Sequence, residues 1–246
     1  MSGHSKWANI KHKKGRMDAL RGKITTKISR EITIAVKNGG ADPAGNMRLK
    51  LALQKARENN IPKENIQRAI QKGQGSLEGS NYEEFMYEGY GPAGVAIMLD
   101  ILTDNRNRTA ADIRHLFSKN NGNLGESGCV SWMFNQKGVI GVEKDGVDEE
   151  ALMLLALDAG ADDFSADGDV YEILTDPGQF EAVQQALDTA KITVASAQLS
   201  MVPQTTVSLS DEDAAKVTRL LEALEEHDDV QEVYTNADLP DEEDED

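Results

Sequence analysis

The charge of this chain changes sign near residue 75, and this change divides it into two bodies with different surfaces. Residues 1–75 contain 17 Lys or Arg against 5 Asp or Glu, a net charge of +12, whereas residues 76–246 carry −29. A segment of one sign concentrates potential and attracts polyanions, while an evenly acidic surface mainly keeps a protein in solution. We therefore expect a basic N-terminal domain that binds a polyanion such as nucleic acid, joined to a separate acidic body.

Three short helices are predicted in the basic region. Apolar residues recur mainly four positions apart over residues 16–37, as in an amphipathic helix, and the glycines at 39 and 40 are a typical stop. Similar patterns predict helices within residues 43–60 and 62–75. Helices of this length form a small bundle, a fold that does not by itself establish a function.

The candidate nucleic-acid contacts are the cations of this region and the rings that lie among them. Lys and Arg gain affinity by releasing counterions from phosphates, and an exposed aromatic ring can stack on a base. The candidates are His4, Lys6, Trp7, Lys11, His12, Lys13, Lys14, Arg16, Lys23, Lys27 and Arg30. Trp7 could equally anchor the N-terminal arm on the bundle, and the whole cluster could be a solvated surface without a specific partner.

The acidic body alternates between strand and helix patterns, and the order places one unit inside another. Residues 137–203 read as strand, helix, two strands, helix and strand, a βαββαβ unit. The flanking segments supply a second such unit, with strands expected at 95–102, 129–134, 206–209 and 230–234. We predict an α+β protein with a helical domain over 1–75 and two ferredoxin-like domains, one over 81–136 plus 204–236 and the other inserted at 137–203. A disordered acidic tail is expected over 237–246.

Two arginines stand out in the acidic body. Arg106 and Arg108 lie in the segment from Thr103 to Thr109, at a strand-to-helix turn where amides point outward. They could contact a phosphate backbone, or they could pair with neighbouring carboxylates, which we favour in so acidic a body. Thr109 and Asp112 have the spacing of a capping box for the helix that follows.

No motif indicates an enzyme, a cofactor or a metal. Residues 89–94 match G-x-G-x-x-G, but the motif opens a strand and not a helix, so a tight turn is favoured over a dinucleotide site. The single cysteine, Cys129, is expected to be a small buried hydrophobe. No apolar run reaches the ~18 residues of a membrane span, so we expect a cytoplasmic protein that makes no membrane contact.

Four motifs resemble the YebC family in sequence and in order. The resemblance spans Ser2 to Tyr234 and rests on Gly3–Lys11, Tyr87–Pro92, Thr103–Thr109 and Gly122–Glu126. It implies an N-terminal helical domain and two α+β domains, one interrupting the other. Members are usually named probable transcriptional regulators and are thought to bind DNA. Mitochondrial relatives are translational activators of cytochrome oxidase subunit I, and bacterial relatives have been linked to helping ribosomes through proline-rich stretches.

Two functions remain open at this point. A translation factor would bind ribosomal or transfer RNA and could act on the ribosome, whereas a transcriptional regulator would bind duplex DNA. We favour RNA because the arm mixes cations, imidazoles and one indole, without a dimer-forming helix or a geometry for reading palindromes. The absence of a transit peptide indicates a bacterial member, and a non-enzymatic monomer is expected.

Overall fold

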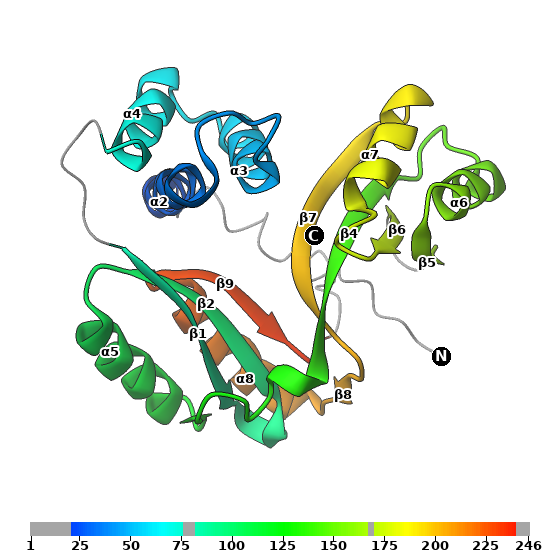
Figure 1. The fold of residues 1–246 in the computed structure, drawn as a ribbon. Coiled ribbons are helices and arrows are strands. Elements are labelled where there is room, and N and C mark those ends of the chain that lie inside the picture. Colours follow the sequence, from blue (N-terminus) through cyan, green and yellow to red (C-terminus); the bar gives the residue numbers. More distant parts are fainter. Residues whose placement is uncertain (1–20, 76–81, 167–169, 240–246) are drawn as a thin grey trace. The chain divides into compact units, whose positions relative to one another are not determined.

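A computed structural model describes residues 21–75, 82–166 and 170–239, and these fall into two compact parts (Figure 1). One part contains residues 21–131 and 211–235, and the other contains residues 132–210 and the segment from 236. The candidates His4, Lys6, Trp7, Lys11, His12, Lys13, Lys14 and Arg16 lie outside the described residues, as does most of the expected acidic tail. The mixed α+β class predicted from the sequence is confirmed.

The first part begins with a three-helix bundle. Its helices are α2 (Arg21–Gly39), α3 (Met47–Glu58) and α4 (Lys63–Gly73). The predicted apolar stripe is buried, with Ile32 and Leu49 fully enclosed at the centre of one hydrophobic cluster. Gly40 ends α2 with a positive φ of 84°, a conformation that glycine adopts without a steric penalty. Asn46 begins α3 by accepting a hydrogen bond from the backbone N of Leu49.

The bundle is followed by a four-stranded antiparallel sheet with the order β3-β1-β2-β9. Its elements are β1 (Glu83–Tyr90), β2 (Ala96–Thr103), α5 (Arg106–Lys119), β3 (Asn123–Leu124), α8 (Asp211–Glu225) and β9 (Val230–Thr235). β9 follows the inserted residues and pairs with β2, as the nested pattern predicts. In Figure 1, α5 and α8 lie on the side of this sheet away from the bundle.

Two strands of this unit were predicted wrongly. The expected strand at 206–209 is reduced to β8 (Val207–Ser208), which pairs in parallel with β10 (Ala237–Asp238) in a separate small sheet. On the side of β2 away from β9 lies β1, an element that the sequence pattern did not reveal. The expected strand at 129–134 is also absent, because the Glu88 carboxylate accepts hydrogen bonds from the backbone N of Gly128, Val130 and Ser131 at 2.7 to 2.8 Å. Those amides are therefore not available to a ladder.

The second part contains the βαββαβ unit as predicted. Its elements are β4 (Phe134–Glu143), α6 (Glu149–Asp158), β5 (Ala161–Ser165), β6 (Val170–Thr175), α7 (Phe180–Thr189) and β7 (Val194–Pro203). The antiparallel order β5-β6-β4-β7 is that of a ferredoxin-like sheet. Gly138 of β4 lets Phe180 of α7 approach the sheet, since a Cβ there would lie 2.3 Å from the Phe180 ring. Across the described residues, no helix is both long enough and apolar enough to cross a membrane.

Candidate nucleic-acid interface

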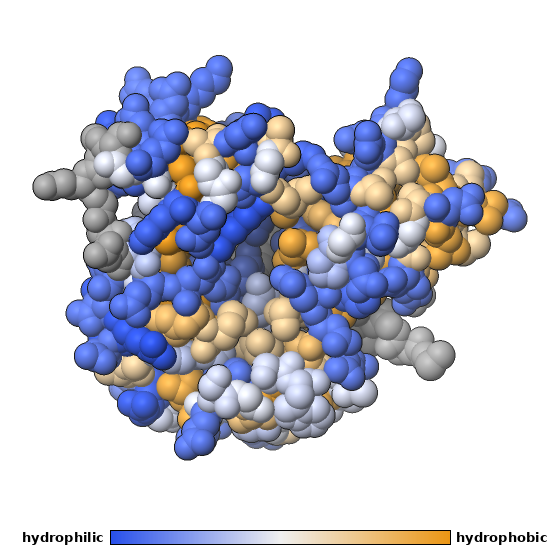
Figure 2. Space-filling model, in the orientation of Figure 1, coloured by the Kyte–Doolittle hydropathy of each residue, from blue (hydrophilic) through white to orange (hydrophobic). Residues whose placement is uncertain are grey.

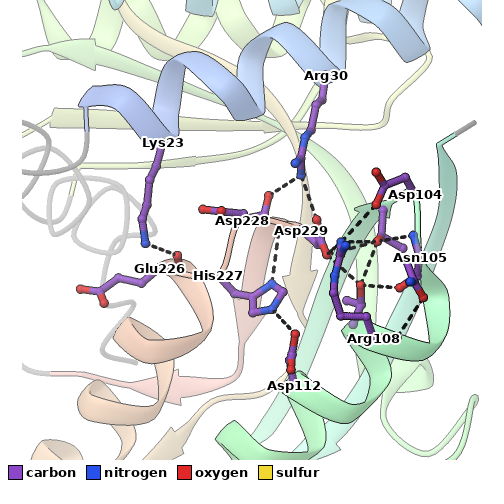
Figure 3. Close-up of polar contacts among 12 residues, drawn as sticks. Lys23, Arg30, Asp104, Asn105, Arg108, Asp112, Glu226, His227, Asp228 and Asp229 are labelled. Carbon is purple, nitrogen blue, oxygen red and sulfur yellow. Dashed lines mark hydrogen bonds and ion pairs between the residues drawn. The ribbon is translucent and has the colours of Figure 1, made fainter. Parts of the chain in front are cut away.

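The described candidates on α2 do not point freely into solvent. Lys23, Lys27 and Arg30 are spaced three and four residues apart, so their side chains lie along one side of the helix. Figure 3 shows Lys23 and Arg30 pointing from α2 toward the segment that follows α8. Each donates a hydrogen bond to a backbone oxygen at or just beyond the end of α8. Lys23 Nζ lies 2.8 Å from Glu226 O, Lys27 Nζ lies 2.6 Å from Glu225 O, and Arg30 Nη1 lies 2.8 Å from Asp228 O.

This arrangement satisfies the carboxyl end of α8. The last carbonyl groups of a helix lack intrahelical partners, and the helix dipole gives that end a partial negative charge. Lys27 and Lys23 meet both needs at once, Arg30 contacts the turn that follows, and α8 itself has no basic residue in its last turn. The α2 cations therefore fasten the bundle to α8. Whether they also contact nucleic acid stays a prediction.

Asp229 is the centre of the contact that Arg30 completes. It lies between α8 and β9 and is 3% exposed, and Arg30 Nη1 donates to its Oδ1 at 2.9 Å. Its other oxygen, Oδ2, accepts hydrogen bonds from Arg108 Nη2 and Thr109 Oγ1 at 2.8 Å and from Thr103 Oγ1 at 3.1 Å. A buried carboxylate is stable only when paired and hydrogen-bonded, and Asp229 has both kinds of partner.

The environment of Asp229 favours its charged form. Burial alone raises the pKa of this carboxyl, but hydrogen bonds from Arg108, Thr109 and Arg30, together with the positive charge of Arg108, bring the pKa below its ordinary value. Thr109 is consequently not the helix cap that its spacing with Asp112 predicts. Asn105 occupies that position and accepts a hydrogen bond from the backbone N of Arg108.

The two arginines of the acidic body have different surroundings. Arg108 pairs with Asp229 and with Asp104 at 3.1 Å, which agrees with the favoured interpretation of structural pairing. The Arg106 guanidinium lies over the Phe85 ring, 4.6 Å from its centroid. Both residues are classed as exposed, so a phosphate contact by either stays a prediction.

Further ion pairs connect the bundle with the face of the β1-β2-β9 sheet that is turned away from α5 and α8. Arg48 of α3 bridges Glu31 of α2 and Glu84 of β1, and Lys55 Nζ lies 3.0 Å from a carboxylate oxygen of Glu232 on β9. Asp100 on β2 shares this acidic surrounding. Burial raises the pKa of Asp100 to about 7, with added repulsion from Glu84, Glu31 and Glu232 and opposition from Arg48.

Other cations of the bundle remain turned to solvent. Five of them are exposed and have no hydrogen-bond or ion-pair partner among the residues that the structure describes; these are Lys37, Arg57, Lys63, Arg68 and Lys72. A Cβ on Gly73 would lie 2.6 Å from Val36, so α2 and α4 pack closely at the ends that carry Lys37 and Lys72. Figure 2 shows mainly hydrophilic surface over the bundle. Lys37 belongs to the cationic side of the helix predicted over residues 16–37, whereas the other four were not singled out from the sequence, although their residue type and their helices were visible there.

Metal-ligating side chains and the single thiol are two further features that could carry chemistry. No group of three or more His, Cys, Asp or Glu within them could hold a metal ion. Cys129 is half-buried, and burial, with repulsion from Glu88, raises the pKa of its thiol, which lowers its reactivity.

Together, these features define a class of mixed α+β protein in which a cationic three-helix bundle is fastened to the first of two antiparallel sheet units. Two family models match the chain, the TACO1/YebC protein N-terminal domain over residues 5–76 and the TACO1/YebC second and third domain over residues 82–237. The chain belongs to the TACO1/YebC family, which confirms the resemblance noted in the sequence.

Relatives of similar length support this membership. Proteins named probable transcriptional regulatory protein from Pelotomaculum thermopropionicum and Moorella thermoacetica are each 60% identical to this chain. Both alignments cover 98% of this chain, with 100% and 96% of the respective relative. A crystal structure of a conserved hypothetical protein from Aquifex aeolicus is 47% identical, with a TM-score of 0.86 over 97% of this chain and 98% of that one.

Proposed function

We propose that this protein is a non-enzymatic, cytoplasmic RNA-binding factor that acts on the ribosome during translation. The observation that carries the proposal is the set of five exposed cations on the bundle, Lys37, Arg57, Lys63, Arg68 and Lys72, in a chain whose net charge is −17. Phosphates are attracted to such a surface, whereas the acidic remainder of the chain repels further nonspecific RNA.

The N-terminal arm extends this basic surface in the proposal. Lys11, Lys13 and Lys14 supply phosphate contacts, and Trp7 supplies a ring that can stack on an unpaired base. The α2 cations have a different role in this scheme, since Lys23, Lys27 and Arg30 already donate to α8 and Asp229. They keep the bundle in place while the arm and the α3–α4 cations meet the RNA.

A second candidate function is duplex DNA binding by a transcriptional regulator. The observation that favours it is the name shared by the relatives from Pelotomaculum and Moorella. Duplex and single-stranded targets differ in salt dependence, with slopes of roughly −0.9 and −0.7 per phosphate neutralised.

The proposal is tested by sedimenting cell lysate through a sucrose gradient at low and high salt and detecting the protein with an antibody. We expect salt-sensitive co-migration with ribosomes, and loss of co-migration when Lys11→Glu, Lys13→Glu and Lys14→Glu are combined. A matched variant, Lys119→Glu with Lys191→Glu and Arg219→Glu, makes the same charge change outside the bundle and should still co-migrate. Recovery of the protein on nucleoid DNA, away from ribosomes, would favour transcription instead.

A further inference from the structure

The outer strand β7 differs from the other strand edges of this protein. It is ten residues long, pairs with β4 on one side, and has no strand on its other side among the described residues. An edge strand presents unpaired N–H and C=O groups, which other extended chains can bind. Natural proteins usually protect such an edge with charged side chains, with bulges or by keeping it short.

The other edges have that protection. On β5, the far edge of the same sheet, Asp162 and Asp163 occupy two of five positions. In the other sheet, β9 carries Glu232 and β1 carries three glutamates, while β3 covers the end of β1. By contrast, no residue from Val194 to Pro203 is charged, in a chain where 28% of residues are, and the bulge and the proline of β7 lie at its two ends, leaving residues 197–202 regular. Pale and orange surface lies over much of β7 in Figure 2.

The two faces beside β7 indicate which side chains a bound strand would carry. Leu199 pairs with Gly138, whose missing Cβ makes room for Phe180, so Leu199 and its alternate neighbour Met201 lie on the face covered by α7. Gln198 and Ser200 lie on the opposite face. A strand added to this edge would therefore have apolar side chains at alternate positions, beside Leu199 and Met201, and polar ones between them.

The net charge of the unit that contains β7 indicates the charge of a strand that could bind there. Residues 132–203 contain 14 Asp or Glu against 3 Lys or Arg. Two copies of so acidic a unit repel each other, which opposes pairing of β7 with the β7 of a second copy, whereas a basic strand is attracted.

We propose that β7 is a docking edge for an extended, cationic segment of a partner protein, in which apolar and basic residues alternate. The segment adds to the sheet as a fifth strand, and its main chain pairs with the outer edge of β7. This inference is independent of the RNA-binding proposal, since it concerns a different part of the molecule and a protein partner.

The test uses the full-length protein and a labelled ten-residue peptide of alternating Lys and Val. Fluorescence anisotropy measures binding, and hydrogen exchange identifies the amides that become protected. We expect protection of β7 amides but not of β5 amides. A peptide with the same number of lysines and proline at every second position should bind at least tenfold more weakly, because proline cannot supply the paired N–H groups.

Variants of β7 test the same edge. Gln198→Lys with Ser200→Lys should weaken peptide binding at least tenfold, whereas Gln198→Glu with Ser200→Glu should retain it. Gln185→Lys with Gln184→Lys on α7 is the control for net charge and should have a small effect. Equal binding of the proline peptide, or binding without protection of β7, would overturn the proposal. A dimer of the free protein with protected β7 amides would also overturn it, in favour of a second copy as the occupant.

Discussion

Asp229 accepts hydrogen bonds from side chains of three separate segments, namely Arg30 of α2, Thr103 at the end of β2, and Arg108 and Thr109 of α5. Because this carboxylate is buried, the loss of its charge would remove the anion that two guanidinium groups share. The residue therefore joins the bundle, the sheet and α5 at a single point.

The substitution Asp229→Asn should lower the free energy of unfolding by about 2 kcal/mol, the range expected for hydrogen bonds to a buried charge. Urea denaturation at pH 7 measures this loss. Asp228→Asn is the matched control, because that neighbouring side chain is exposed and only its backbone oxygen contacts Arg30. Equal effects of the two substitutions would contradict the role given to Asp229.

The stability lost in Asp229→Asn should depend on pH, with a sign that follows from the pKa of Asp229. The folded pKa of Asp229 is lowered, so its stabilisation is present above its ordinary pKa of ~3.9 and is lost as pH falls through the folded pKa. The difference in stability between wild type and Asp229→Asn should therefore be constant from pH 7 to about pH 5 and shrink below about pH 4.

Asp100 should show the opposite behaviour. Its folded pKa is raised to about 7, so the folded state binds a proton more tightly than the unfolded state, and stability falls as pH rises from about 4 through 7. Asp100→Asn keeps the shape and removes the charge. We expect the variant to be more stable than wild type by about 1 kcal/mol at pH 8 and nearly equal to it at about pH 4, below which both states bind the proton, after allowance for solvent screening. Denaturation at the two pH values measures this, and a constant difference would contradict it.

At the scale of elements, α2 stabilises the carboxyl end of α8, because Lys23 and Lys27 donate hydrogen bonds to backbone oxygens there. Lys23→Gln with Lys27→Gln should lower the free energy of unfolding by about 1 kcal/mol, since each cation at a helix end contributes roughly 0.3 to 1 kcal/mol. Hydrogen exchange should become faster in the last turn of α8. Lys37→Gln with Lys72→Gln removes two cations that have no described partner, so its stability should match wild type.

The elements that could be predicted are those whose pattern is local. The buried stripe of α2 and the alternation in β4, β6 and β7 are legible because each element buries one face of its own sequence. β1 escaped prediction because three of its eight residues are glutamate, and one of them, Glu88, is buried to bind loop amides. The expected strand at 129–134 is absent because the amides of Val130 and Ser131 donate to this Glu88 carboxylate.

The contacts of the site were harder to foresee than its elements. Asp229 lies 199 residues from Arg30 and 121 from Arg108, and no short motif connects them. The sequence showed that cations are concentrated in the basic region. Only the fold distinguishes Lys27, which donates to α8, from Lys72, which is exposed without a described partner.

At the scale of the whole molecule, the division of charge has two consequences. Some cations of the bundle are used within the protein, to hold it against acidic groups and carbonyl oxygens of the neighbouring sheet unit. The remaining cations are available to an external polyanion. The central claim is that these two sets are different residues.

The salt dependence of RNA binding tests that claim most directly. A labelled single-stranded RNA is titrated with wild type, with Arg68→Gln plus Lys72→Gln, and with Lys23→Gln plus Lys27→Gln, at several salt concentrations. The account predicts that the first variant loses about 0.7 in the slope of log affinity against log salt for each phosphate contact removed, while the second keeps the wild-type slope. An unchanged slope for Arg68→Gln plus Lys72→Gln, with a reduced slope for Lys23→Gln plus Lys27→Gln, would contradict it.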